Sequence, residues 1–156
     1  MFTLRGGADR RPRFRLPWSA CIGATEWQVQ LNPMVSSDII AHSDGGNLKL
    51  NLTGMAVTRV SVDTGGGNID VVLPDAAVNL SVAAKTGAGN VVVVIPDDMP
   101  VRIHATTGLG KVVMDPQFTM IDKNTYQSSD FEHAANKVEI TASSGAGNVI
   151  VNARNE

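Results

Sequence analysis

Cysteine and long apolar runs are scarce in this chain of 156 residues, and each scarcity excludes a class of protein. A single cysteine, Cys21, excludes an internal disulfide framework and a zinc site with several cysteine ligands. No apolar run approaches the ~18 residues that a membrane-spanning helix needs. Residues 16–25, interrupted by Pro17 and Ser19, make a poor secretion signal. We therefore expect a chain that is soluble as given, either cytoplasmic or associated with the cell envelope, and that meets a membrane only indirectly.

Charge is scarce as well, because charged residues make up only 18% of the chain and the net charge is −2. This balance argues against a nucleic-acid partner. Residues 1–15 hold five arginines and one aspartate, whereas residues 16–156 hold eight basic and fourteen acidic residues. We expect a basic N-terminal arm and cap over residues 1–25, with a mobile stretch at 1–15, followed by a β-repeat domain over residues 26–156.

Valine, isoleucine and glycine, in contrast, are abundant, with 19, 9 and 15 residues. β-Branched residues favour strands, and glycine favours tight turns. The apolar share of 43% is large enough to build a core, which excludes disorder of the whole chain. Composition therefore favours an all-β protein.

One motif, Gly-x-Gly-Asn or a near variant, occurs five times in the chain. The spacings between the final glycines are 21, 22, 21 and 37 residues, so the last spacing is one period plus an insertion, which we place at residues 115–136. A repeat of this kind indicates stacked copies of one structural unit. The copies are Asp44-Gly45-Gly46-Asn47, Gly65-Gly66-Gly67-Asn68, Gly87-Ala88-Gly89-Asn90, Gly108-Leu109-Gly110-Lys111 and Gly145-Ala146-Gly147-Asn148.

Alternating apolar and polar residues flank every copy of the motif. The first inward residue after each motif stands two positions beyond the final glycine, as in Leu48, Ile69 and Val91. A slip of one residue would turn every buried side chain outward, so five equal registers indicate stacking. The inward positions switch between even and odd residue numbers across each motif, which indicates that the chain turns a corner there. Glycine and asparagine tolerate the backbone conformation of such a corner. The residues assigned to structural turns are Gly46, Asn47, Gly67, Asn68, Gly89, Asn90, Gly110, Gly147 and Asn148.

These patterns predict a parallel β-solenoid of about five two-strand coils, each ~21 residues long. Stacked in the order of the chain, the asparagines of the turns form a ladder of side-chain amides with rungs roughly 4.8 Å apart. Lys111 interrupts that ladder. The alternative is an antiparallel β meander or sandwich, because a turn of this composition between alternating strands is also a hairpin signal.

The ends and the insertion carry most of the aromatic residues. Trp18 and Trp27 either cover the open end of the first coil or belong to a partner site. The insertion holds Phe118, Tyr126 and Phe131, and its residues 128–135 fit a short helical turn. It is either a flap that packs its aromatics over one sheet or a specificity loop.

No residue pattern in the sequence supports catalysis, a metal or a cofactor. The glycine motifs lack the Gly-Lys-Ser/Thr of a phosphate loop, and no serine lies in a Gly-x-Ser-x-Gly elbow. His42, His104 and His133 occupy non-equivalent repeat positions, and the Asp97-Asp98 pair lies in a turn. We predict a protein that is not an enzyme.

Apolar residues also occupy outward positions of the second strands, where polar residues are expected. Stacked, they form a stripe on one outer sheet, and such a patch marks an interface unless the insertion or the N-terminal segment covers it. The residues of this possible interface are Val72, Val92, Val94, Val113 and Ile150.

Several segments resemble one bacterial family. They are Trp27-Gln28-Val29-Gln30-Leu31-Asn32-Pro33, Asp38-Ile39-Ile40, the run from Gly46 to Gly54, the repeated Gly-Ala-Gly-Asn, Thr107-Gly108-Leu109-Gly110, Tyr126-Gln127-Ser128 and the run from Ala134 to Ile140. They resemble the C-terminal toast-rack-like, adhesin-like β-repeat domain of membrane proteins that accompany envelope-stress two-component systems. The resemblance covers residues 26–152 and implies a β-solenoid without known catalytic residues, linked to responses to cell-wall-active agents. The chain departs from that family in lacking its N-terminal transmembrane helices, which puts membrane attachment in doubt.

Together these observations predict a non-catalytic interaction module linked to the bacterial cell-envelope stress response. It is expected to act through a protein partner or through self-association as a homo-oligomer. The alternative is a structural subunit of the cell envelope that assembles into oligomers or filaments, because solenoids with open ends can stack.

Overall fold

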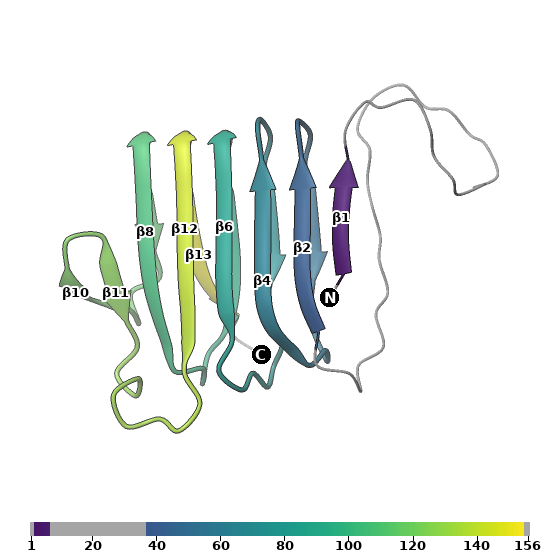
Figure 1. Cartoon of the computed structure of the whole chain (residues 1–156). Coiled ribbons are helices and arrows are strands. Elements are labelled where there is room, and N and C mark those ends of the chain that lie inside the picture. The colour runs from purple at the N-terminus through teal and green to yellow at the C-terminus, as the bar shows by residue number, and fades with distance from the viewer. Residues whose placement is uncertain (1, 7–36, 155–156) are drawn as a thin grey trace.

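Each repeat of the sequence gives one strand to each of two stacked β-sheets in the computed structural model (Figure 1). The structure describes residues 2–6 and 37–154, and these residues form strands and turns without a helix. The strands are β1 (Phe2–Gly6), β2 (Ser37–Ser43), β3 (Leu48–Asn51), β4 (Val57–Thr64), β5 (Ile69–Val72), β6 (Ser81–Ala88), β7 (Val91–Pro96), β8 (Val101–Leu109), β9 (Val112–Met114), β10 (Thr119–Asp122), β11 (Thr125–Gln127), β12 (Val138–Ala146) and β13 (Val149–Arg154).

The repeats correspond to the strand pairs β2–β3, β4–β5, β6–β7, β8–β9 and β12–β13, which are called repeats 1 to 5 below. The eight-stranded sheet has the order β1-β2-β4-β6-β12-β8-β11-β10, and the five-stranded sheet has the order β3-β5-β7-β13-β9. The two strands that flank each glycine turn lie in different sheets, and equivalent strands of neighbouring repeats pair in parallel. The hairpin meander is therefore wrong, and both sheets are mostly parallel.

The core lies between the sheets and follows the register of the repeats. The first inward residues of the five-stranded sheet are direct register partners: Ile69 pairs with Val91, and Val149 pairs with Val91 and Val112. Ile69, Val91 and Val149 are 0% exposed. Burying each such side chain contributes roughly 1.5–3 kcal/mol, so the stacked rows supply most of the stabilisation of both sheets.

The order of the repeats differs from the predicted order of the chain. Repeat 5 lies between repeats 3 and 4, because β12 pairs with β6 and β8, and β13 pairs with β7 and β9. All repeats share one register, so the apolar pattern fits either order equally well. The insertion decides between them, since its strand β11 pairs along the other edge of β8 and occupies it.

The N-terminal arm contains a strand, which the prediction of a mobile stretch at residues 1–15 did not include. β1 pairs in parallel with β2 along residues 2–6. The sequence Phe2-Thr3-Leu4-Arg5 has the alternation of a strand, and the edge of β2 offers unpaired backbone groups. The predictions for Trp18, Cys21 and Trp27 fall outside the described residues.

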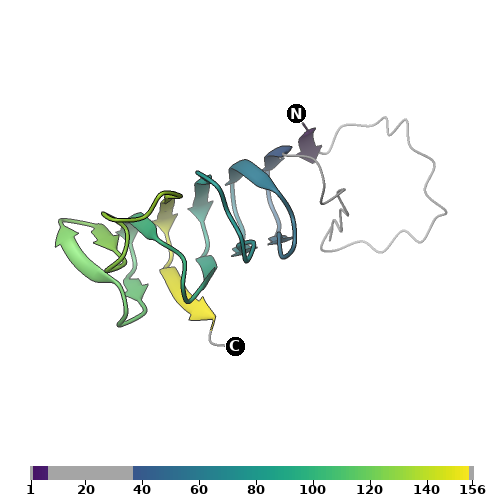
Figure 2. The same cartoon turned by 90° about the horizontal axis from the view of Figure 1, so that it is seen from below.

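The insertion extends the eight-stranded sheet at its end (Figure 2). β11 pairs antiparallel with β8, and β10 pairs antiparallel with β11. Phe118 is 6% exposed and Phe131 is 2% exposed, and Tyr126 packs against the core. The predicted helical turn at residues 128–135 is instead a pair of hydrogen-bonded turns, Phe131 N–H to Ser128 O and His133 N–H to Asp130 O. Phe118 and Tyr126 thus pack at the core, whereas Phe131 packs against Arg102, an outward residue of β8.

Candidate interaction surface

The outward apolar residues of the second strands lie together on the outer face of the five-stranded sheet, and they are called the apolar stripe below. Val92, Ile150 and Val113 form one row across β7, β13 and β9. Val72 and Val94 form a second row across β5 and β7. Val92 and Val94 stand two residues apart on β7 and join the rows, so the stripe is contiguous.

Polar residues border the apolar stripe on the same face. The first row continues from Val92 to Asp70 and Lys49 on β5 and β3. The second row ends at Asn51 on one side and at Asn152 on the other. An apolar centre with a polar border is the usual composition of a protein contact surface.

The members of the apolar stripe are partly shielded by one another. Val113, on the edge strand, is 49% exposed, and the other four residues are half-buried. Parallel neighbours stand roughly 4.8 Å apart, which leaves a flat surface of methyl groups. Such a surface offers no hydrogen bonds, so burial of its area is its only source of binding energy.

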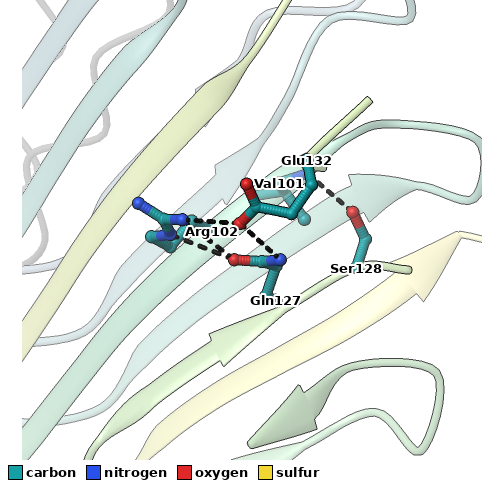
Figure 3. A network of polar contacts seen from close by, with 5 residues as sticks. All are labelled: Val101, Arg102, Gln127, Ser128 and Glu132. Atoms are coloured by element: carbon teal, nitrogen blue, oxygen red, sulfur yellow. Dashed lines mark hydrogen bonds and ion pairs between the residues drawn. The ribbon is translucent and has the colours of Figure 1, made fainter. Parts of the chain in front are cut away.

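A polar network holds the insertion against β8 of the eight-stranded sheet (Figure 3). Arg102 donates from Nε and Nη2 to Gln127 Oε1, both at 3.1 Å, and from Nη2 to Glu132 Oε1 at 3.1 Å. Gln127 Nε2 donates to the same Glu132 oxygen at 3.1 Å. The Arg102 guanidinium also lies 4.4 Å from the centre of the Phe131 ring.

Two further hydrogen bonds, both between Ser128 and Val101, complete this attachment. Ser128 N–H donates to Val101 O, and Val101 N–H donates to Ser128 Oγ, both at 2.9 Å. Arg102 could not be recognised as an anchor from the sequence, because its partners Gln127 and Glu132 lie 25 and 30 residues away. With β10 and β11 in the eight-stranded sheet, the insertion does not form a layer over the apolar stripe.

The predicted turn glycines form a column that connects the two sheets. Gly46, Gly67, Gly89, Gly110 and Gly147 all have positive φ, between +108° and +152°. A Cβ on Gly67, Gly89, Gly147 or Gly110 would overlap the carbonyl oxygen of the equivalent glycine in the preceding stacked repeat. Both the backbone conformation and the close stacking therefore require glycine at the inner repeats.

The turn asparagines form a ladder that differs in two ways from the predicted one. Each Oδ1 accepts from a backbone N–H of the next repeat, not from another amide. The N–H of Lys111 donates the last bond, and Lys111 ends the ladder instead of interrupting it, because repeat 5 precedes repeat 4 in the stack. The bonds run from Asn68 N–H to Asn47 Oδ1 at 3.0 Å, Asn90 to Asn68 at 3.0 Å, Asn148 to Asn90 at 2.9 Å and Lys111 to Asn148 at 3.0 Å.

A column of hydroxyl groups lies beside the glycines and was not predicted. Thr86 Oγ1, Ser144 Oγ and Thr107 Oγ1 donate to the carbonyls of Gly67, Gly89 and Gly147, at 3.0, 2.8 and 2.7 Å. Each carbonyl belongs to the preceding stacked repeat. Thr86 and Ser144 are buried, so these bonds satisfy polar groups that are removed from water. The sequence signal was present, since a Ser or Thr precedes the first glycine position of every motif.

The histidines lie apart from one another. His42 stands between Asp44 and Asp63, with Nε2 3.6 Å and Nδ1 3.8 Å from their carboxylate oxygens, on an exposed surface. His104 Nδ1 lies 3.2 Å from Thr125 Oγ1, and His133 is in the exposed turn of the insertion. In the described part of the chain, no three His, Cys, Asp or Glu side chains gather as metal ligands.

Helices that could cross a membrane are likewise not found among residues 2–6 and 37–154.

Two family models match the chain in overlapping segments. Residues 11–94 match the N-terminal domain of toast_rack, DUF2154. Residues 78–151 match the C-terminal domain of the cell wall-active antibiotics response protein LiaF. None of the curated proteins matches the sequence significantly.

One solved structure shares this fold. It is a crystal structure from Clostridium sporogenes ATCC 15579, which carries the provisional description of a cell adhesion protein. Its TM-score is 0.76 at 24% sequence identity, and the match covers 80% of this chain and 58% of that chain. Since the toast_rack model spans more than half of the sequence, this protein belongs to the toast-rack family, and its resemblance to the envelope-stress regulators is confirmed.

Proposed function

We propose that this chain is a non-catalytic β-solenoid interaction module of the bacterial cell-envelope stress response, and that it binds a protein partner through the apolar stripe. The carrying observation is the contiguous apolar surface of Val72, Val92, Val94, Val113 and Ile150 on an outer sheet face. Burying such a surface against a partner removes methyl groups from water without breaking any hydrogen bond.

The scaffold suits a surface that binds without changing shape. Each strand beneath the apolar stripe is fixed by ladder bonds on one or both sides and by inward residues such as Val93 and Val151, which are 0% exposed. A rigid sheet presents its side chains at fixed spacing, so little conformational entropy is lost on binding. The match to the LiaF C-terminal model supports a role at the envelope.

This function is tested by measuring the transcriptional response to a cell-wall-active antibiotic in a bacterium that carries the gene. We expect deletion of the gene to change the response, and the double variant Val92→Lys/Val94→Lys to reproduce the deletion. The matched control is Lys49→Glu/Asn51→Lys, which changes charges on the polar border of the same sheet, and it is expected to behave as the wild type. A deletion without effect would refute the stress-response role, whereas a wild-type response from the Val92/Val94 variant would refute the surface.

Self-assembly into an envelope subunit is the second candidate, supported by β9, which has β13 as its only strand partner among the described residues. Light scattering of the purified chain across concentrations separates the two functions. A stable higher oligomer favours the structural subunit. A chain that stays monomeric favours a different protein as the partner.

A further inference from the structure

Repeat 5 occupies a slot in the stack whose two walls are equivalent. In the eight-stranded sheet, Ile140 is the register partner of Val82 on one wall and of Ile103 on the other. In the five-stranded sheet, Val149 is the partner of Val91 and of Val112. If repeat 5 were withdrawn, repeats 3 and 4 would face each other in the same register.

The turns show the same equivalence. A Cβ on Gly145 would lie 2.5 Å from Gly87 O, and a Cβ on Gly108 would lie 2.7 Å from Gly145 O, so the three glycines stack at equal intervals. Asn148 accepts from Lys111 N–H as Asn90 accepts from Asn148 N–H. If repeat 5 left the stack, the turn of repeat 4 could therefore donate the same hydrogen bonds to the equivalent oxygens of repeat 3.

Loop lengths show that the chain also permits the closed stack. The loop between β7 and β8, residues 97–100, is four residues long and must step past two strand positions because repeat 5 intervenes. Counted between register-equivalent residues, this connection has seven residues, 95–101, and the connections that step by one position have seven, 52–58, and eight, 73–80. A connection of similar length therefore spans twice the step, and it would cross a closed slot with less extension.

The linker that leads into repeat 5 has slack. Ser128 is bonded to Val101 on one side of β8, and Val138 is the register partner of Val101 on the other side. The nine residues 129–137 between them need to cross only two strand spacings, roughly 10 Å. Fully extended, nine residues reach about 30 Å. Once the two turns of the linker open, repeat 5 can therefore leave its own slot.

We propose that repeat 5 is an exchangeable strand pair, and that two copies of this chain swap it, each inserting β12 and β13 into the slot of the other. The contacts of β12 and β13 with the slot are the same in their own chain and in a second copy, so exchange loses none of them, and its cost is the opening of the linker, where Phe131 and Glu132 contact Arg102. A short tether holds its own repeat at an effective concentration of about 1 mM, so swapped and unswapped forms balance at or above that protein concentration. The proposal does not rest on the apolar stripe, which exchange leaves unchanged.

Cross-linking between two single-cysteine full-length chains, both carrying Cys21→Ser, tests the exchange. One chain carries Ala83→Cys on β6 and the other Thr141→Cys on β12; both positions are exposed and are direct register partners. After incubation of the mixture, a short thiol cross-linker joins the two chains only if β12 of one lies beside β6 of the other. We expect the fraction of the chains that is cross-linked as dimer to rise about tenfold for each tenfold increase in dilute protein concentration.

Two controls make the result decisive. The double variant Ala83→Cys/Thr141→Cys in one chain is expected to cross-link internally, which validates the geometry. A mixture of Ser61→Cys and Ala83→Cys chains tests non-specific association, because these register partners belong to repeats 2 and 3, which do not exchange. Absence of dimer in the first mixture, or equal dimer in both mixtures, would overturn the proposal.

The contacts of Arg154 at the end of β13, called the latch here, should limit the rate of exchange. Arg154 pairs with Asp75, and its Nη1 lies 3.5 Å from Thr53 Oγ1. These contacts break during exchange and form again afterwards. Arg154→Ala should therefore speed the appearance of cross-linked dimer severalfold and leave its final yield unchanged. A changed yield at an unchanged rate would contradict a swap in which the latch is the same in both forms.

Discussion

The two outer faces of this protein cover one core but carry opposite chemistry. On the eight-stranded sheet the middle outward row consists of short or polar residues, Ser61, Ala83, Thr141 and His104 in neighbouring strands. On the five-stranded sheet the corresponding outward positions of repeats 3 to 5 hold the methyl groups of the apolar stripe. The repeat that specifies the inward residues thus leaves the outward ones free to differ.

Charged residues sharpen the contrast, because the eight-stranded face places opposite charges side by side. Lys85 is the register partner of Asp63, and Arg102 is the register partner of Glu139. Neighbouring opposite charges satisfy each other in water, so this face gains little from a partner. On the five-stranded face the oppositely charged partners Lys49 and Asp70 lie at the border of the apolar stripe, and the stripe itself gains from any surface that covers it. This contrast is why the proposed binding surface lies on the five-stranded face.

The largest expected loss of stability comes from a lysine on the inward side of β7, compared with a lysine on its outward side. Val93→Lys buries a charge at a position that is 0% exposed, and an unpaired buried charge costs several kcal/mol. We expect this variant to unfold, whereas Val92→Lys on the outer side of β7 should change stability by no more than about 0.5 kcal/mol. Urea denaturation measures both. Equal losses would show that the outer side of β7 is covered within the chain.

Alanine substitutions in the glycine turns that join the two sheets are expected to cause the next largest loss of stability. Gly147→Ala places a Cβ against Gly89 O at φ +141°, whereas a Cβ on Gly46, at φ +108°, meets no atom within 4 Å. Strain of a positive φ costs roughly 1–3 kcal/mol in both variants. Overlap adds about 1–3 kcal/mol at Gly147 only. Thermal unfolding of the two variants compares them, and a larger loss from Gly46→Ala would contradict the stacking of the turns.

Loss of the Arg102 network should have a smaller effect and should not touch the apolar stripe. Arg102→Ala removes the bonds to Gln127 and the cation–π contact with Phe131, together worth about 1–2 kcal/mol. Hydrogen exchange should rise in β10 and β11 and stay unchanged in β7 and β13. Faster exchange in β7 would mean that the insertion also supports the five-stranded face.

The smallest effect belongs to the exposed charges of the eight-stranded face. Lys85→Ala removes one member of the pair with Asp63, and exposed cross-strand pairs contribute roughly 0.2–1 kcal/mol. A shift in melting temperature near the limit of measurement is expected, smaller still at high salt because of screening. A loss above 2 kcal/mol would show that this face is not solvated as described.

Periodicity predicted the local features of the fold because they repeat. The inward positions Ile69, Val91 and Val149 and the turn glycines follow from alternation and from the need for positive φ. The order of the repeats could not be predicted, since β6 accepts β8 or β12 in the same register. The anchor at Arg102 was equally hidden, because it depends on side chains that only the insertion brings near.

Contact mapping in living cells tests most directly whether the two faces differ as binding surfaces. A photoreactive phenylalanine is placed at Val94 on the five-stranded face or at Thr141 on the eight-stranded face, each at an outward position. We predict a protein adduct of one defined mass from Val94, lost when Val92 is also changed to Lys, and no adduct from Thr141. Adducts from Thr141 alone, or equal adducts from both positions, would contradict the assignment of binding to the apolar stripe.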